Sequence, residues 1–303
     1  MHVLVYGAGA VGGYYGACLQ AGGHAVTFVA RGATLEALRR RGLTIERPDA
    51  PLVLPDVTVV DDPGAAEPAD LVLVCVKSYD TPAAAAALRA VVGTDTIVVS
   101  LQNGVENEAL LAAGLGVPPL LVAFTRIGVA AREPGAIQYS GRGEIYFGEP
   151  DGRESARTAA FSAALDRAGI PHERRPDVLV RAWEKLAWNA GFNAVTTLTD
   201  TTVGEVLDRP ASRRLVVAAM EEVDAVATAL GIPVRRTRTA AVLDDSRHGL
   251  GDFATSMLQD RRRGRRLEWD ALGGAVVRAA ERAGVPVPVN RTLCALLAGL
   301  GAG

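Results

Sequence analysis

The feature that most constrains the fold is a glycine turn between a short apolar segment and a helical one, at the start of the chain. Residues 2–6 (HVLVY) predict a strand, and residues 7–23 (GAGAVGGYYGACLQAGG) predict a glycine turn that runs into a helix. Residues 25–29 (AVTFV) predict a second strand. Strand, helix and strand in this order form a βαβ unit with parallel strands, so the chain is expected to open an α/β fold.

The first half of the chain continues this alternation. Near-continuous apolar strands recur with helical segments such as 81–92 between them, at residues 70–76, 96–101 and 119–124. Such strands indicate a parallel sheet that is covered on both faces. Residues 132–150 predict short strands and turns, added antiparallel at the sheet edge. A helix at 154–169 and a strand-like segment at 170–175 close this half.

After Pro176 the strand patterns give way to helical ones. Amphipathic spacing predicts helices at about 177–195, 211–231, 235–247, 253–263, 266–284 and 289–299. The expected organisation is therefore a Rossmann-type, doubly wound parallel sheet in residues 1–175, followed by an all-α domain in residues 176–303.

Composition excludes several classes of function. Hydrophobic residues make up 49% of the 303 residues, too many for a disordered chain, and the net charge of −2 gives no general attraction for nucleic acid or anionic lipid. The arginine run 261–266 is interpreted as a solvated helix end. We expect no nucleic-acid or membrane partner.

The cysteines and histidines argue against metal and disulfide chemistry. Cys18, Cys75 and Cys294 are far apart, and none of the four histidines has metal-ligand spacing, so no metal site is expected. The sequence shows neither a signal peptide nor an apolar run of the ~20 residues that a membrane span needs. A cytoplasmic protein is predicted.

The glycine turn has the spacing of a dinucleotide-binding fingerprint. Gly7, Gly9 and Gly12 form G-x-G-x-x-G, which Ala8, Ala10 and Val11 complete. In this context the first glycine permits a tight turn, the second lets the backbone approach a pyrophosphate, and the third allows close helix packing. The N–H groups at the helix start then face the phosphates. We expect a dinucleotide on these six residues.

The residue after the second strand indicates which dinucleotide. NAD-binding proteins place an acidic residue there to hold the ribose 2′-hydroxyl, whereas this chain has Arg31. A guanidinium suits a 2′-phosphate, so NADP is favoured over NAD.

Two more polar residues, Lys77 and Asn103, come just after predicted strands. Ligands bind beyond the carboxyl ends of the strands in open parallel sheets, so both are expected near the nicotinamide end of the cofactor or the substrate.

The helix expected at 177–195 carries an unusual polar stripe. Lys185, Asn189 and Asn193 fall four residues apart and share one face, among apolar residues that ought to be buried. Of the 32 basic residues only Lys77 and Lys185 are lysines. A lysine that persists in an arginine-rich chain suggests a position that requires an ammonium able to lose its proton.

Taken in order, these motifs resemble the ketopantoate reductase (2-dehydropantoate 2-reductase) family. The resemblance covers nearly the whole chain. Beyond the glycine turn and Arg31 it rests on VKSYD at 76–80, LQNGVEN at 101–107, WEKLAWNAGFN at 183–193, SMLQD at 256–260, and Glu268.

The resemblance implies an NADPH-dependent enzyme that reduces ketopantoate to pantoate, in the pathway to pantothenate and coenzyme A. It implies that residues 1–175 bind NADP and that residues 176–303 form the substrate-binding and catalytic domain. Lys185 would be the general acid that protonates the carbonyl oxygen, with Glu268 as the second residue of the catalytic set. Arg31 would bind the 2′-phosphate, and Lys77 would lie near cofactor and substrate. The substrate would be held at a domain cleft by Asn103, Asn189, Asn193, Ser256 and Glu268, with Asn103 also positioning the nicotinamide.

Two positions depart from the family pattern. Phe253 and Val203 stand where some members carry asparagines of the substrate pocket, and an apolar wall there suits another side chain on the 2-keto acid. The alternatives are therefore a related NADPH-dependent reductase of another branched or aromatic 2-keto acid, and a non-catalytic NADP sensor. The helical second domain offers a surface for a homodimer.

Overall fold

The computed structural model describes residues 1–118, 120–235 and 239–300. The chain forms two compact units. The α/β unit comprises Met1–Gln102 and Asn107–Val178, and the helical unit comprises Asn103–Glu106 and the chain from Leu179 onward. The second unit thus includes a four-residue loop, Asn103–Glu106, that the sequence pattern places within the first.

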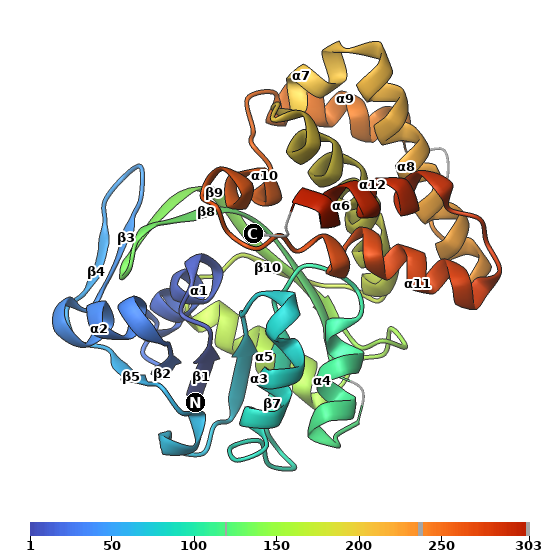
Figure 1. Ribbon diagram of the computed structural model, residues 1–303. Coiled ribbons are helices and arrows are strands. Elements are labelled where there is room, and N and C mark those ends of the chain that lie inside the picture. The colour runs from blue at the N-terminus through green and yellow to red at the C-terminus, as the bar shows by residue number, and fades with distance from the viewer. Residues whose placement is uncertain (119, 236–238, 301–303) are drawn as a thin grey trace. The chain divides into compact units, whose positions relative to one another are not determined.

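The first sheet of the α/β unit is a five-stranded parallel sheet in the order β5-β2-β1-β6-β7 (Figure 1). Its strands are β1 (His2–Tyr6), β2 (Ala25–Val29), β5 (Thr58–Val60), β6 (Leu71–Val74) and β7 (Ile97–Ser100). The helices of this unit are α1 (Ala10–Ala21), α2 (Gly32–Arg41), α3 (Thr81–Leu88), α4 (Asn107–Leu115) and α5 (Ala156–Arg167). The expected Rossmann-type sheet is confirmed.

The alternation of side chains along β1 shows why this sheet is covered on both faces. Val3 and Val5 point into one buried cluster together with residues of α1 and α5. Leu4 and Tyr6 point into a second cluster with residues of α3 and α4. Because both faces of each strand are apolar, the sheet needs helices on each side.

A second sheet was only partly predicted. It has the order β10-β9-β3-β4, with β8 paired to β9. The expected short strands at 132–150 are instead part of a long antiparallel hairpin, β8 (Val122–Glu133) and β9 (Ala136–Gly148). The strands β3 (Leu43–Glu46) and β4 (Leu52–Leu54) were not predicted, and β10 (His172–Arg174) pairs parallel to β9.

The hairpin escaped prediction because its ladder is irregular. The pairing of β8 with β9 shifts register at three places, between Arg126 and Ile127, between Gly128 and Val129, and between Ala131 and Glu133. Each shift interrupts the two-residue alternation from which a strand is recognised, so one long strand looks like several short ones.

The helical unit contains seven α-helices among the residues that the structure describes, and no strand among them. They are α6 (Val178–Thr199), α7 (Val203–Asp208), α8 (Pro210–Ala229), α9 (Thr239–Leu250), α10 (Ser256–Arg262), α11 (Gly273–Ala283) and α12 (Pro288–Leu300). The first of these begins at Val178, the last residue of the α/β unit. Part of the helix expected at 235–247, residues 236–238, lies outside the described residues.

One helix of this unit was not predicted, and another was predicted to begin too early. The six-residue helix α7 was not expected, although Thr202 and Glu205 form a capping box at its start. The helix expected at 266–284 begins only at Gly273, because residues Trp269–Ala271 form a 3₁₀ turn, η4, that ends at Leu272 with φ −105° and ψ −91°.

None of the helices in the described part of the chain is long and apolar enough to cross a membrane. In the same residues, no group of three or more His, Cys, Asp or Glu side chains is placed to hold a metal ion.

The glycine turn between β1 and α1 is tightly packed at Gly7 and Gly12 and open at Gly9. Gly7 has φ +104°, and a Cβ there would lie 2.8 Å from the backbone nitrogen of Val76. A Cβ on Gly12 would collide with the carbonyl oxygen of Gly7. At Gly9, by contrast, a Cβ would meet nothing within 4 Å. The turn therefore requires two glycines for its own packing, whereas the third leaves space.

This difference predicts that two alanine substitutions affect different properties, one the stability of the protein and the other its binding of NADPH. Gly12→Ala should lower the free energy of unfolding by ~1–3 kcal/mol, as overpacking does. Gly9→Ala should leave the unfolding free energy nearly unchanged but weaken NADPH binding at least about tenfold, because the new methyl group would occupy the space that a pyrophosphate needs. Chemical denaturation and cofactor titration of both variants measure the two effects. Equal NADPH affinity in Gly9→Ala and the parent protein would contradict the predicted cradle.

Candidate functional site

The start of α1 offers an anion site. The helix begins at Ala10 with Gly9 as its N-cap, and it has neither a side-chain cap nor an acidic residue in its first turn. The N–H groups of a first helical turn lack partners within the helix and favour negative charge. The N–H of Ala8 is not available to a ligand in the same way, because it donates to the carbonyl oxygen of Val29 at 3.3 Å. Among the predicted cradle residues, Gly9, Ala10 and Val11 are therefore the ones we expect to face the phosphates.

Arg31 lies close to this turn. The N–H of Gly7 also donates to Val29, at 3.1 Å, which joins the turn to the end of β2 just before Arg31. Arg31 is exposed at the N-cap of α2, and its Nη2 donates to the phenol oxygen of Tyr6 at 3.5 Å. Burial raises the pKa of Tyr6, so the phenol stays neutral. The guanidinium is thus available at the edge of the predicted cradle.

Lys77 follows β6, the strand next to β1, and is half-buried at the N-cap of a 3₁₀ turn, η2 (Ser78–Asp80). Because Val76 lies against Gly7, the position of Lys77 is beside the glycine turn. The carboxyl ends of β1, β2 and β6 therefore bring Gly7, Arg31 and Lys77 to one edge of the sheet, where ligands bind in folds of this class.

A buried hydrogen-bond network, which the sequence did not reveal, frames the loop after β7. Gln102 donates through Nε2 to the carbonyl oxygen of Val76 at 3.0 Å and to Thr81 Oγ1 at 2.9 Å. Thr81 in turn donates to Asn107 Oδ1 at 2.9 Å. Gln102 and Asn107 are the residues on either side of Asn103–Glu106, so both ends of this loop are held. The signal in the sequence was a pair of carboxamides, Gln102 and Asn107, on either side of the four residues that begin with Asn103.

Within the helical unit, Lys185 and Asn103 form a hydrogen bond. Lys185 Nζ donates to Asn103 Oδ1 at 3.0 Å. Lys185 is half-buried on α6, while its neighbours Trp183, Leu186 and Ala187 lie in the core of the unit. The stripe is therefore not a simple solvent-facing one, because its ammonium meets a carboxamide of another segment.

The two asparagines of the stripe are linked to each other and to α10. Asn193 is 2% exposed, and its Oδ1 accepts from the N–H of Met257 at 3.3 Å. Its Nδ2 donates to Asn189 Oδ1 at 3.1 Å. Since both oxygens act as acceptors, the amino group of Asn189 is the end that is left to donate toward a ligand. Asn193 is placed to orient Asn189, and Ser256, the exposed first residue of α10, lies next to Met257.

Glu268 is half-buried and directly precedes η4. Of the two residues that depart from the family pattern, Val203 is fully buried in the core of the helical unit, so it does not form the apolar pocket wall that we expected. Its N–H donates to the carbonyl oxygen of Phe253 at 3.1 Å. Phe253 is only partly buried against that core, so it alone remains available as such a wall.

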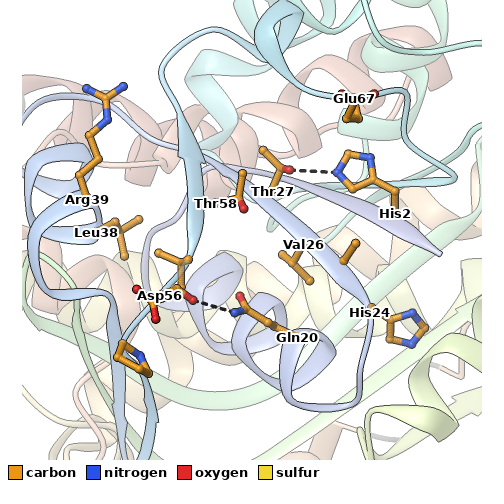
Figure 2. Close-up of a pocket in the computed structure, with 13 residues that line it drawn as sticks. His2, Gln20, His24, Val26, Thr27, Leu38, Arg39, Asp56, Thr58 and Glu67 are labelled. Atoms are coloured by element: carbon orange, nitrogen blue, oxygen red, sulfur yellow. Dashed lines mark hydrogen bonds between the residues drawn. The ribbon is translucent and has the colours of Figure 1, made fainter.

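The structure also contains a pocket of about 530 Å³ in the α/β unit, shown in Figure 2. His2, Thr27 and Gln20 line it, with His2 Nε2 2.9 Å from Thr27 Oγ1. His2 is the first residue of β1, whereas the glycine turn follows the last. This pocket is therefore at the amino edge of the sheet and is not the predicted dinucleotide cradle. A second cavity, of about 10 Å³, lies beside Asn189, Trp269 and Asn290 and has room for about one water molecule.

Comparison with known proteins covers both units. Residues 3–152 match the family model described as "Ketopantoate reductase PanE/ApbA", and residues 177–301 match "Ketopantoate reductase PanE/ApbA C terminal". The 2-dehydropantoate 2-reductases of Halobacterium salinarum and Archaeoglobus fulgidus are 36% and 35% identical to this chain. The alignments cover 98% and 99% of this chain, respectively, and 98% of each relative.

A solved structure agrees with this. The 2-dehydropantoate 2-reductase from Geobacter metallireducens GS-15 superimposes with a TM-score of 0.92 at 33% identity, over 99% of each chain. The resemblance first seen in the motifs is confirmed: this chain belongs to the ketopantoate reductase family.

Proposed function

We propose that this chain reduces 2-dehydropantoate to pantoate with NADPH. The observation that carries the proposal is the contact of Lys185 Nζ with Asn103 Oδ1, in a chain that belongs to the ketopantoate reductase family. When bound, NADPH supplies the hydride that reaches the ketone carbon. Lys185 donates a proton to the ketone oxygen, so the ketone becomes a hydroxyl group, and the lysine then regains a proton from solvent.

The cradle fits a dinucleotide on its own geometry. Gly9 leaves open space above the start of α1, and Gly7 and Gly12 allow that close approach. Arg31 would hold the 2′-phosphate, and the predicted role of Lys77 is to line the nicotinamide end.

The helical unit fits a substrate rich in acceptors. Lys185 has donors only, and the amide chain Met257–Asn193–Asn189 leaves the amino group of Asn189 to donate. A 2-keto acid presents a carboxylate and a ketone oxygen, all acceptors. Asn103, Ser256 and Glu268 complete the proposed substrate contacts, with Glu268 accepting from the substrate hydroxyl.

The same proposal extends to assembly and compartment. Cys18, Cys75 and Cys294 are free thiols, the usual state of cysteine in a reducing compartment. This supports a cytoplasmic enzyme. A homodimer stays a prediction, which sedimentation equilibrium tests.

The direct test of the function follows NADPH absorbance with a panel of 2-keto acids. Ketopantoate should give the highest kcat/KM, above other branched and aromatic 2-keto acids. A higher kcat/KM for an aromatic acid would favour the related-reductase alternative, with Phe253 as the residue to test. Tight NADPH binding without turnover of any acid would favour the sensor.

Cofactor preference is expected to depend on Arg31. NADPH should bind at least about tenfold tighter than NADH, since a charge-assisted contact with a phosphate is worth ~1.5–3 kcal/mol. Arg31→Ala should remove most of this difference, whereas Arg40→Ala, an exposed arginine on the same helix, should preserve it. Fluorescence titration with both cofactors measures the ratio. A parent protein with equal affinity for the two cofactors would rule out the assigned role of Arg31.

The role of Lys185 is tested by replacing it with arginine. Guanidinium keeps its proton at any accessible pH, so Lys185→Arg retains the charge but cannot act as an acid. We expect NADPH to bind nearly normally and kcat to fall by ~10²–10⁴, the usual contribution of a positioned general acid. Stopped-flow measurement of a single turnover isolates the chemical step. If Lys185→Arg keeps more than about half of the parent kcat, the proton comes from another group.

A further inference from the structure

One arginine of α11 contacts the loop that carries Asn103 and the turn that follows Glu268. We propose that Arg278 is a positioning residue: its guanidinium holds the loop Asn103–Glu106 so that Asn103 stays at Lys185. This inference rests on the proposed function, since it assigns the loop a task in that reaction. It concerns only residues of the helical unit.

The contact with the loop is made through Glu106. Arg278 donates to Glu106 Oε2 from Nη2 at 2.7 Å and from Nε at 3.1 Å. Glu106 is three residues beyond Asn103, and its side chain is 25% exposed. Arg282, one helical turn further on, approaches the other oxygen of Glu106 at 3.8 Å. The far end of the loop is therefore attached to α11, while Asn103 at its near end is attached to α6.

The guanidinium is itself fixed from the other side by Asp270. Nη1 donates to Asp270 Oδ1 at 2.7 Å, and Nη2 donates to the Asp270 carbonyl oxygen at 2.9 Å. Gly274 makes room for this arrangement, because a Cβ there would lie 2.6 Å from Asp270 Oδ1 and 3.3 Å from Arg278 Nη1. Asp270 belongs to η4, directly after Glu268.

The buried network fixes Gln102 and Asn107 on either side of the loop, so the clamp acts on the four residues between them. Gly104 has φ +110°, a conformation that only glycine adopts readily, and glycine leaves the backbone the most freedom to move. Asn103 can accept from Lys185 only while the loop keeps this conformation. Arg278 presents its donors to two carboxylates in a fixed planar fork. The three donors of a lysine ammonium rotate and lack this fixed geometry.

The clamp lies largely at the surface, so its effect on turnover can be distinguished from an effect on the stability of the fold. The side chain of Arg278 is 40% exposed and that of Asp270 is 64% exposed. Arg278→Lys keeps the positive charge at this site, so the substitution removes the planar geometry of the clamp more than its electrostatic attraction. Loss of the clamp should therefore affect turnover much more than the unfolding transition.

The first experiment compares Arg278→Lys in two backgrounds. In the parent enzyme, the substitution should lower kcat about 10- to 100-fold, as a misplacement of ~1 Å does, with NADPH affinity unchanged. In the Asn103→Ala background, it should lower kcat by less than about threefold, because the group that it positions is already gone. Arg291→Lys is the matched control, since Arg291 pairs with Glu281 on the surface of the same unit, and it should change kcat less than about twofold.

Two outcomes of that cycle would overturn the proposal. One is an Arg278→Lys enzyme with parental kcat. The other is an equal loss of kcat in both backgrounds, which would mean that Arg278 acts independently of Asn103.

A second experiment does not depend on turnover. Amide hydrogen exchange in a peptide covering residues 101–107 should become faster in Arg278→Lys and stay unchanged in Arg291→Lys. If the parent reduces no 2-keto acid but this exchange difference is seen, the proposed function fails while the clamp stands. Unchanged exchange in Arg278→Lys would overturn the clamp, whatever the activity of the parent.

Discussion

The close approach of α1 to the end of β1 is the constraint on which the α/β unit depends. Gly12 packs against the carbonyl oxygen of Gly7, and Gly7 packs against Val76, two residues after β6. No side chain fits at either glycine, so the start of α1 is held directly beyond the strand ends. The same packing leaves the backbone at Gly9 open. The close packing at Gly7 and Gly12 thus leaves space at the N-terminus of α1, where a phosphate is expected to bind.

What could be predicted from the sequence depended on how regular each local pattern is. Four of the five parallel strands were found because they are short, apolar on both faces and separated by helices, whereas β5 was not predicted. Residues 122–124 of the strand expected at 119–124 belong instead to the antiparallel β8. The strands β8 and β9 were misjudged because three register shifts break their alternation. The start of α11 was misjudged because residues 266–272 have helical composition, yet three of them form a 3₁₀ turn that leads into the clamp at Asp270.

In the candidate site, too, only residues that form a regular local pattern could be predicted from the sequence. Lys185, Asn189 and Asn193 could be singled out because four-residue spacing on one helix is visible in the sequence. Arg278 and Glu106 are 172 residues apart. Glu106 lies in the LQNGVEN motif, but nothing in that motif or in the sequence around Arg278 indicates that the two side chains pair. Contacts of this kind follow from the fold, not from periodicity, so only the structure could identify the clamp.

Arginine and lysine occupy different kinds of contact in this chain, and the chemistry of their charged groups explains the difference. Arg278 holds Glu106 and Asp270, and Arg175 holds Glu173 and Asp177. In both places a planar guanidinium bridges two carboxylates and never needs to give up a proton. Lys185 instead donates to the uncharged carboxamide oxygen of Asn103 at 3.0 Å. In the proposed reaction this ammonium gives up a proton to the ketone oxygen, which a guanidinium cannot do at any accessible pH.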